Sequence, residues 1–191
     1  MIKTFKNYDI NFNKHIWQVK AIRLFGKSRY RQLVIFGESG RGKTHLMQAI
    51  LNGTGTYEKG FRSVKKVRFV RAEEFYFLIL RSAFGMEVND FFCPDFSFDD
   101  MMESRVIIID DLGKEKKESK DKENFVTAFK LLLDKYKGKV IITTNMNKKS
   151  ILDRYGEFIH NRIFDKNITL KILLTGKDYR KTNNIKREVK L

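Results

Sequence analysis

A glycine-rich motif between a predicted strand and a predicted helix constrains this chain more than any other feature. Residues 33–36 read LVIF, a short apolar run typical of a buried strand. The residues that follow read GESGRGKT and match the pattern G-x-x-x-x-G-K-[ST], and an amphipathic segment covers residues 44–52. Glycines allow backbone N–H groups to turn inward around an anion, and the N-terminal end of a helix adds positive partial charge. The motif therefore predicts a phosphate-binding loop in an α/β protein.

Two side chains of this loop have roles that follow from the chemistry of a bound nucleoside triphosphate. Lys43 is expected to reach the β- and γ-phosphates, and the Thr44 hydroxyl is expected to bind Mg²⁺, which bridges phosphate oxygens. A chance glycine-rich turn is a poor alternative, because the motif is complete and both flanks have the required character. The sequence thus predicts ATP and Mg²⁺ as cofactors. The residues expected around the phosphates are Gly37, Glu38, Ser39, Gly40, Arg41, Gly42, Lys43 and Thr44.

Short apolar runs alternate with amphipathic segments along the chain. Strands interleaved with helices imply a parallel sheet covered on both faces. The runs VIII and VIIT are short and rich in β-branched residues, so they are expected to be buried on both faces of the sheet. Residues 91–102 interrupt the pattern at Pro94 and are expected to form an inserted loop with a short helix. The expected strands are 33–36, 64–70, 106–109 and 140–144, and the expected helices are 44–52, 72–84 and 124–136.

An acidic pair, Asp110 and Asp111, follows the run VIII. Alone, two aspartates after an apolar strand are often a solvated turn. Together with a phosphate loop, they have the form expected of an acidic pair at the end of a neighbouring strand. Asp110 is then expected to hold Mg²⁺ through water, and Asp111 is expected to orient and deprotonate the attacking water.

The run VIITT ends at Asn145. An asparagine at the end of a strand is usually a turn residue. Its amide could instead position the attacking water or touch the γ-phosphate from the opposite side. The spacing alone leaves both interpretations open.

The excess of basic residues indicates the kind of partner. The chain has 39 Lys and Arg against 23 Asp and Glu, which gives a net charge of +16. Such a charge attracts a polyanion and makes its binding salt-dependent, so nucleic acid is the favoured partner. The alternative is a compositional habit, because A+T-rich coding would also enrich the chain in Lys, Asn, Ile and Phe.

Length and composition favour one cytoplasmic domain over residues 1–191. The chain is 42% hydrophobic, enough to bury a core, and no apolar run approaches the roughly 20 residues that cross a bilayer. The start lacks the apolar stretch of a signal peptide. Cys93 is the only cysteine and is expected to pack rather than to form a disulfide or a zinc site. The mixed-charge run KEKKESKDKE at residues 114–123 is expected to stay out of the core as a loop or helix start.

Several segments resemble, in order, the motifs of a known family. They are TFKNYDI, GESGRGKTHLMQAI, VRFVRAEEFYFLILRSAF, VIIIDDLGKE, VIITTNMNKKSILDRYGEFIHNRI and LTGKDYR. The family is that of the DnaC and DnaI helicase loaders, with the related IstB transposition ATPases and the core of the DnaA initiator. GKT alone is shared by countless ATPases. The combination of GKTHL, IDDLG, TTN and the YGE…NRI segment is much more specific, and the resemblance covers nearly the whole chain.

The resemblance implies an AAA+ sheet of order 5-1-4-3-2 followed by a small C-terminal lid, with ATP bound between neighbouring protomers of a homo-oligomer. Residues 1–32 would form the leading segment and the first helix, and TFKNYDI, which contains Tyr8, would lie along the adenine. His45, in GKTHL, joins the residues expected at the nucleotide. Residues 150–191 would form the arginine-finger and lid region.

The resemblance also implies roles for polar side chains beyond the phosphate loop. Asn145 would be the sensor-1 residue. Arg162, in HNRIF, matches the arginine finger that reaches the ATP of the next subunit, where a guanidinium offsets charge in the transition state. The alternative for Arg162 is an ordinary surface arginine on a helix. The lid sensor has two candidates, Arg180 and Lys171.

In these loaders, single-stranded DNA is gripped by the helix after the second strand and by the segment after the acidic pair. A cation for phosphates beside an aromatic ring for stacking suits binding of a strand without regard to its sequence. The alternatives are that the aromatic residue belongs to the core and that the lysines merely solvate a loop. The residues at these places are Arg81, Phe84, Lys116, Lys117 and Lys120.

The function implied is that of an ATP-dependent AAA+ ATPase that assembles on single-stranded DNA and helps to place a replicative helicase. Because the phosphate loop already begins at Gly37, the separate amino-terminal region that usually grips the helicase is expected to be missing, as in a compact phage or mobile-element version. Asp111 replaces the glutamate of many relatives and withdraws the carboxylate by about one methylene, so slow hydrolysis is expected. The alternatives are an IstB-like transposition ATPase, a viral DNA-packaging motor, and a binding module that does not hydrolyse nucleotide.

Overall fold

A five-stranded parallel sheet forms the centre of the protein, in the order β2-β3-β4-β1-β5. The computed structural model describes residues 3–11, 14–53, 67–84, 95–115 and 119–180. The expected strand order is confirmed. The expected lid continues into residues 181–191, which lie outside the described residues. The strands are β1 (Gln32–Phe36), β2 (Val67–Arg71), β3 (Val106–Leu112), β4 (Lys139–Thr144) and β5 (Thr169–Leu173).

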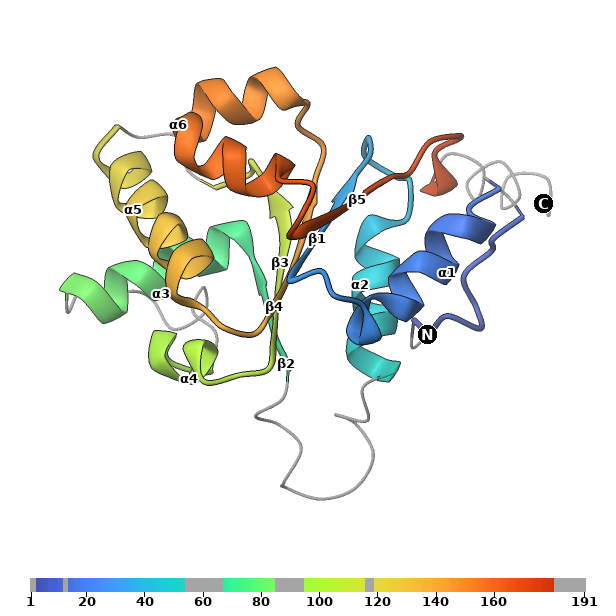
Figure 1. Ribbon diagram of the computed structural model, residues 1–191, viewed down its shortest axis with the longest axis horizontal. Helices are drawn as coiled ribbons and strands as arrows, with labels where there is room; N and C mark the ends of the chain where they lie inside the picture. Colours follow the sequence, from blue (N-terminus) through green and yellow to red (C-terminus); the bar gives the residue numbers. More distant parts are fainter. Residues whose placement is uncertain (1–2, 12–13, 54–66, 85–94, 116–118, 181–191) are drawn as a thin grey trace, which may run out of the picture.

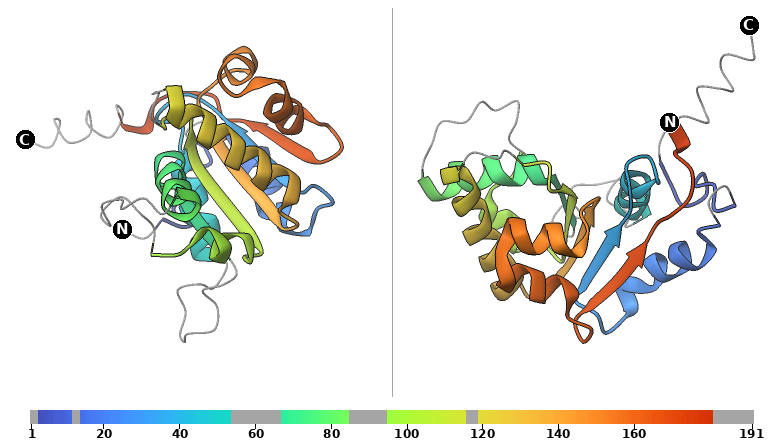
Figure 2. Two further views of the ribbon diagram at one scale, coloured as in Figure 1. Left: turned by 90° about the vertical axis from the view of Figure 1, so that its left-hand side faces the viewer. Right: turned by 90° about the horizontal axis from the view of Figure 1, so that it is seen from above.

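Helices cover both faces of this sheet (Figures 1 and 2). The helices α3, α5 and α6 lie on one side, and α1 and α2 lie on the other, as a parallel sheet requires. Among the described residues, no helix is long and apolar enough to cross a membrane. The helices are α1 (Ile16–Leu24), the short 3-10 helix η1 (Phe25–Lys27), α2 (Lys43–Gly53), α3 (Ala72–Phe84), α4 (Phe98–Met102), α5 (Ser119–Lys135) and α6 (Lys148–Phe164).

The central strands are buried on both faces, as the runs VIII and VIIT predict. Successive side chains of a strand point to opposite faces, so Ile107 and Ile109 pack in the core beneath α3, α5 and α6. Ile108, between them, packs on the other side with the residues of α1 and α2. All three are fully buried. This double burial fixes the end of β3, and with it the acidic pair, beside the phosphate loop.

Some element boundaries differ from those expected. β3 includes the acidic pair and ends at Leu112 rather than at Ile109, and its register with β4 shifts between these two residues. β2 runs one residue further than expected, while residues 64–66 lie outside the described residues. α5 begins at Ser119, before the expected start, because the charged run continues directly into the helix.

The segment 91–102, which interrupts the alternating pattern, contains a short helix, as expected. The helix α4 begins after Ser97, whose hydroxyl accepts from the Asp100 backbone N–H at 3.0 Å, and the Asp100 carboxylate accepts from the Ser97 N–H at 3.0 Å. This reciprocal capping satisfies donors that the first turn of a helix leaves free. Residues 85–94 lie outside the described residues.

The helix α6 consists of two arms that meet at Gly156 (Figure 1). Gly156 has φ 80° and ψ 175°, a conformation that is essentially restricted to glycine. A Cβ at this position would meet nothing within 4 Å, so the backbone conformation, not lack of space, requires the glycine. Tyr155 therefore lies on the first arm, and Arg162 lies on the second.

Candidate phosphate-binding site

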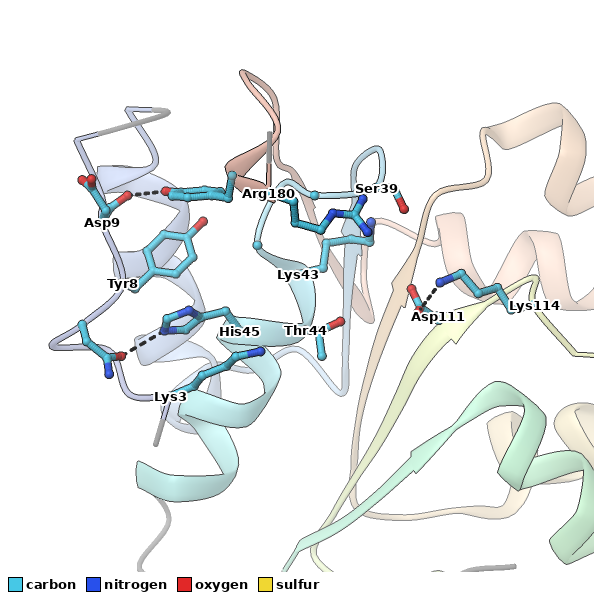
Figure 3. A pocket seen from close by; sticks show the side chains of 14 residues that line it. Lys3, Tyr8, Asp9, Ser39, Lys43, Thr44, His45, Asp111, Lys114 and Arg180 are labelled. Carbon is cyan, nitrogen blue, oxygen red and sulfur yellow. Dashed lines mark hydrogen bonds and ion pairs between the residues drawn. The ribbon is translucent and has the colours of Figure 1, made fainter. Parts of the chain in front are cut away.

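A cavity of about 530 Å³ lies between the leading segment, the phosphate loop and the end of β3 (Figure 3). Its size is within the range usual for small-molecule sites. Basic side chains approach it from several segments of the chain, so an anionic ligand suits it. The described residues that line it are Lys3, Asn7, Tyr8, Asp9, Ser39, Gly40, Gly42, Lys43, Thr44, His45, Asp111, Lys114, Tyr179 and Arg180.

Two glycines of the phosphate loop are needed for both conformation and space. Gly40 and Gly42 have φ of 78° and 88°, in the left-handed region that favours glycine. A Cβ on Gly40 would lie 1.9 Å from Asp178 Oδ1, and a Cβ on Gly42 would lie 2.9 Å from the Tyr8 ring. The sequence pattern therefore folds as a loop packed tightly against the leading segment and the residues after β5.

Lys43 begins α2 and is held beneath the loop. Its side chain is buried, and its Nζ donates hydrogen bonds to Gly37 O at 2.6 Å and to Glu38 O at 3.0 Å. Burial lowers the pKa of Lys43, while the nearby charges of Asp111 and Asp110 oppose this shift. The ammonium group is therefore preorganised at the loop and has no carboxylate bound to it directly in the described structure. A phosphate oxygen would supply the missing counter-charge.

Thr44 and Asp110 are already in contact. Thr44 Oγ1 donates a hydrogen bond to Asp110 Oδ2 at 2.9 Å, and Thr143 Oγ1 donates one to Asp110 Oδ1. Asp110 is only 1% exposed, so its orientation is fixed by these two hydroxyls. Oxygen ligands of this kind are those that Mg²⁺ prefers, and the pair fits the metal role predicted from the sequence.

Asp111 faces the cavity from the end of β3, where the chain begins to turn. It has φ 60°, its N–H donates to Thr143 Oγ1 at 2.9 Å, and its carboxylate forms an ion pair with Lys114 Nζ at 2.6 Å. The Lys114 N–H closes the turn by donating to Asp111 O at 3.1 Å. The sequence reasoning missed Lys114. Lys114 lies three residues after Asp111, and a cation so close to the acidic pair is the signal that could have identified it.

Aromatic rings line the opposite end of the cavity. The Tyr8 ring lies edge-on to His45, with centroids 5.2 Å apart, and 6.0 Å from the ring of Tyr179. Tyr8 and His45 were predicted at the nucleotide, whereas Tyr179 was not. Tyr179 is tied to the loop because its N–H donates to Gly40 O at 3.0 Å.

A buried histidine anchors this aromatic end. His15 is fully buried; its Nε2 lies 2.8 Å from Thr175 O, and the Tyr8 hydroxyl lies 2.7 Å from its Nδ1. Because a carbonyl only accepts, Nε2 carries the proton and Nδ1 accepts from Tyr8. Burial lowers the pKa of His15, which favours this neutral form. The leading segment and the chain after β5 are thereby joined beside the phosphate loop.

The charged run at residues 114–123 contains a buried carboxylate, which corrects the expectation that it stays out of the core. Glu115 is 4% exposed and accepts hydrogen bonds from Arg154 Nε at 2.6 Å, the Tyr155 hydroxyl at 2.5 Å and the Gly113 N–H at 2.9 Å. Burial opposes the charge of Arg154, but the hydrogen bond and charge of Glu115 raise its pKa overall. A matched ion pair, rather than an apolar side chain, thus joins the turn after Asp111 to α6.

The remaining predicted residues lie in different places. Arg180 lines the cavity, whereas Lys171 lies on β5 and donates from Nζ to Phe164 O at 3.1 Å. Asn145 is exposed just beyond the end of β4 and is not among the described residues that line the cavity. Arg162 is on α6, where it pairs with Asp134 at 3.1 Å and lies over the Phe158 ring. The loop residues Gly37, Glu38 and Arg41 are not among the described residues that line the cavity; the carbonyls of Gly37 and Glu38 accept from Lys43, and Arg41 pairs with Glu38.

The predicted DNA-contacting residues are only partly described. Arg81 is exposed on α3. Phe84 and Lys120 lie on α3 and α5, but their side chains are outside the description, as are Lys116 and Lys117 entirely. The question of whether Phe84 packs in the core therefore stays a prediction.

The sequence matches one protein family over most of its length. The model of the bacterial DnaA ATPase domain family matches residues 4–165. The chromosomal replication initiator protein DnaA of Methylobacillus flagellatus is 32% identical over 65% of this chain. That of Azoarcus sp. is 31% identical over 75% of this chain. The chain spans about a quarter of the length of these curated relatives, 24% and 27% respectively.

Solved structures of related proteins share the fold. AMPPCP-bound DnaA from Aquifex aeolicus has a TM-score of 0.63 at 19% identity and covers 98% of this chain and 54% of its own. The DnaC helicase loader has a TM-score of 0.64 at 19% identity, with 91% of this chain and 97% of that chain covered. DnaI has a TM-score of 0.63 at 18% identity, with 90% of each chain covered. The resemblance inferred from the motifs is confirmed, and this chain, with its AAA+ fold, belongs to the bacterial DnaA ATPase domain family.

Proposed function

We propose that this chain is an ATPase that binds ATP with Mg²⁺, associates with single-stranded DNA and helps to place a replicative helicase. One observation carries the ATPase part of this proposal. A single cavity brings together the Lys43 ammonium, Thr44 in contact with Asp110, and the Asp111 carboxylate. These are the groups that phosphoryl transfer to water needs, and they come from segments far apart in the sequence.

Different residues would bind the phosphates, hold Mg²⁺ and activate the attacking water. Lys43 and the N–H groups of the loop would hold the β- and γ-phosphates, and Thr44 with Asp110 would hold Mg²⁺, which offsets charge on the phosphate oxygens. Asp111 would orient the attacking water and accept its proton. At the other end of the cavity, Tyr8, with the rings beside it, offers a surface for the adenine.

The ion pair between Asp111 and Lys114 supports slow turnover. One oxygen of the Asp111 carboxylate already accepts from the Lys114 ammonium group at 2.6 Å, so that oxygen is occupied and is not free to accept from the attacking water. Lys114 also lines the cavity, where the γ-phosphate would offer it a second anion. Assembly or DNA binding could raise the rate by moving Lys114 from Asp111 to the phosphate.

Arg162 would act on the nucleotide of a neighbouring copy. Arg162 is not among the described residues that line the cavity of its own chain, and its ion-pair partner Asp134 is exposed. Exposed ion pairs contribute about 0–1 kcal/mol, so Arg162 could leave Asp134 for a phosphate at little cost. The proposal therefore includes a homo-oligomer formed on ATP or DNA, with Asn145 as the sensor residue at the end of β4.

A mixing experiment tests the ATPase and its assembly together. The Arg162→Ala protein should bind ATP but turn it over poorly, and Lys43→Ala should fail to bind ATP. Mixing the two should restore part of the wild-type rate, because one supplies an intact pocket and the other supplies the arginine. Turnover is measured by phosphate release, and mixed assembly is verified by co-purification of differently tagged copies. Proven mixed assembly without recovery would exclude a finger acting in trans.

Single-stranded DNA is proposed as a partner on the basis of charge and of the relatives. The chain carries +16, and a structure sharing its fold, with a TM-score of 0.62 at 21% identity, is that of DnaA bound to AMPPCP and single-stranded DNA. The DnaC structure is that of a helicase loader. The residues proposed to touch DNA remain Arg81, Phe84, Lys116, Lys117 and Lys120.

Binding of single-stranded DNA should be tighter with ATP and should weaken steeply with salt. Each of the substitutions Lys116→Ala, Lys117→Ala and Lys120→Ala should lower the salt slope by roughly one charge or less, because each removes a phosphate contact. Lys166→Ala, an exposed lysine after α6, is the charge-matched control and should keep the wild-type slope. Fluorescence anisotropy of labelled DNA measures both effects. Equal affinity with and without ATP would refute the coupling.

A further inference from the structure

The amino-terminal third of the chain contains a stretch with basic but no acidic residues. Between Asp9 and Glu38 there is no Asp or Glu. The helix α1 lies in this stretch, on the side of the sheet opposite to α5 and α6 (Figure 1). Of the residues proposed above to touch DNA, the described Arg81 lies on α3, on the opposite side of the sheet from α1 (Figure 1). The basic residues of the stretch are Lys14, Lys20, Arg23, Lys27, Arg29 and Arg31.

The outer face of α1 presents the only tryptophan of the chain to solvent. Val19 and Ile22 point into the core, while Trp17 is 74% exposed and Leu24 is 54% exposed. Trp17, Lys20 and Leu24 follow one another at helical spacings of three and four, so they share one face of the helix. Lys20 Nζ lies 5.3 Å from the centroid of the Trp17 ring. The cation and the ring therefore form one continuous surface.

The exposed cations of α1 and of the short helix η1 that follows it form no ion pair with a described carboxylate. Lys20, Arg23 and Lys27 are exposed, and none of them forms an ion pair with a carboxylate of the described residues. Arg23 instead lies over the Phe5 ring at 5.8 Å. An anionic partner would supply the missing counter-charge, and the tryptophan would gain a planar or apolar contact.

We propose that the exposed surface of α1 and η1 is a binding surface for single-stranded nucleic acid, with a base stacked on Trp17 and phosphates held by Lys20, Arg23 and Lys27. Stacked aromatic rings and a cationic track are the two features of binding without sequence preference. The bases of a duplex are already stacked on one another, so only a single strand can use the ring. In a helix that lies on a membrane, cations and apolar groups occupy opposite faces, whereas here Lys20 lies between Trp17 and Leu24 on one face.

Intrinsic fluorescence tests this surface directly, because Trp17 is the only tryptophan. An oligothymidylate of about 20 nucleotides, longer than the usual footprint of about 4–16, should quench the emission until it saturates. Added salt should reverse the quenching. In parallel, anisotropy of labelled oligothymidylate reports binding anywhere on the protein. DNA binding without quenching of Trp17 would overturn the proposal and leave the DNA site proposed above intact.

Variants separate stacking from charge. Trp17→Ala should weaken binding by about 5- to 150-fold, while Trp17→Phe should keep much of the affinity. Lys20→Ala should lower the salt slope by roughly one charge. Phe158→Ala is the matched control, since Phe158 is also an exposed ring beside a cation, Arg162 at 5.3 Å, and it should bind as wild type does. Circular dichroism melting should show that Trp17→Ala folds, as its exposure implies. Wild-type affinity for Trp17→Ala would contradict the proposal.

Other occupants would give different signals, and each would overturn it. If a membrane surface were the partner, vesicles containing anionic phospholipid would shift the Trp17 emission to shorter wavelength, and DNA would not quench it. An oligoglutamate that competes as well as DNA would show that charge alone is recognised. A change of emission with protein concentration alone, together with a larger mass in solution, would show that a second copy covers α1.

Discussion

Replacement of Asp111 by asparagine is expected to leave ATP and Mg²⁺ binding intact and to lower turnover by about 10²- to 10⁴-fold, the usual contribution of a general base. The amide cannot accept the proton of the attacking water. The substitution suits the backbone, because Asp111 has φ 60° and asparagine is among the residues that best tolerate positive φ. Titration with a fluorescent ATP analogue and measurement of phosphate release separate the binding step from the chemical step.

Lys43→Ala is the contrasting variant. In the described structure, Lys43 Nζ donates hydrogen bonds only to the carbonyls of Gly37 and Glu38, so its charge is available for phosphate. Loss of this side chain should therefore abolish nucleotide binding, before any chemical step. In the titration, the Asp111→Asn protein should therefore bind the ATP analogue, whereas the Lys43→Ala protein should not. Both proteins should turn over ATP slowly. Turnover of Asp111→Asn at the wild-type rate would assign the proton acceptor to another group.

The sequence was sufficient for the parts of the fold that depend on local patterns. Residues 107–109 and 140–142 are β-branched, and a strand buried on both faces is the arrangement that satisfies them. The phosphate loop could also be predicted, because its conformation depends on residues within the motif itself. The glycines at positions 40 and 42 occupy positive φ, which few other residues tolerate, so the motif determines its own conformation.

Contacts between distant segments could not be predicted in this way. His15 reaches Thr175 across 160 positions in the sequence, and nothing in the residues around either one indicates the partner. A lone histidine is compatible with the surface, a core contact or a catalytic role. His15 is buried because the leading segment packs against the chain after β5. That packing depends on how the whole sheet is assembled, which local sequence does not specify.

Glu115 was mispredicted for a related reason. It stands in a run of alternating charges, and such runs are usually solvated. Its burial depends on Arg154 and Tyr155, which lie 39 and 40 positions away on α6. Composition describes the average of a segment, whereas a single ion pair with good geometry can bury one of its members.

The ion pair of Glu115 with Arg154 leads to the largest expected effect on stability. Removing one partner leaves the other charge buried without compensation, which costs about 3–5 kcal/mol. Arg154→Leu does this, since the side chain of Glu115 is 3% exposed and would keep only the Tyr155 hydroxyl and the Gly113 N–H. At about 2–4 °C per kcal/mol for a chain of this size, the melting temperature should fall by roughly 10 °C.

Two variants make this prediction specific. Arg162→Ala removes an arginine from the same helix, but its pair with Asp134 is exposed on both sides, with 38% and 41% of the side chains accessible, so it should cost about 0–1 kcal/mol. Adding Glu115→Gln to Arg154→Leu should recover part of the loss, because the buried negative charge is then removed as well. Thermal and denaturant unfolding measure all three proteins. If Arg154→Leu were no less stable than Arg162→Ala, the buried pair would not be what holds the turn after Asp111 against α6.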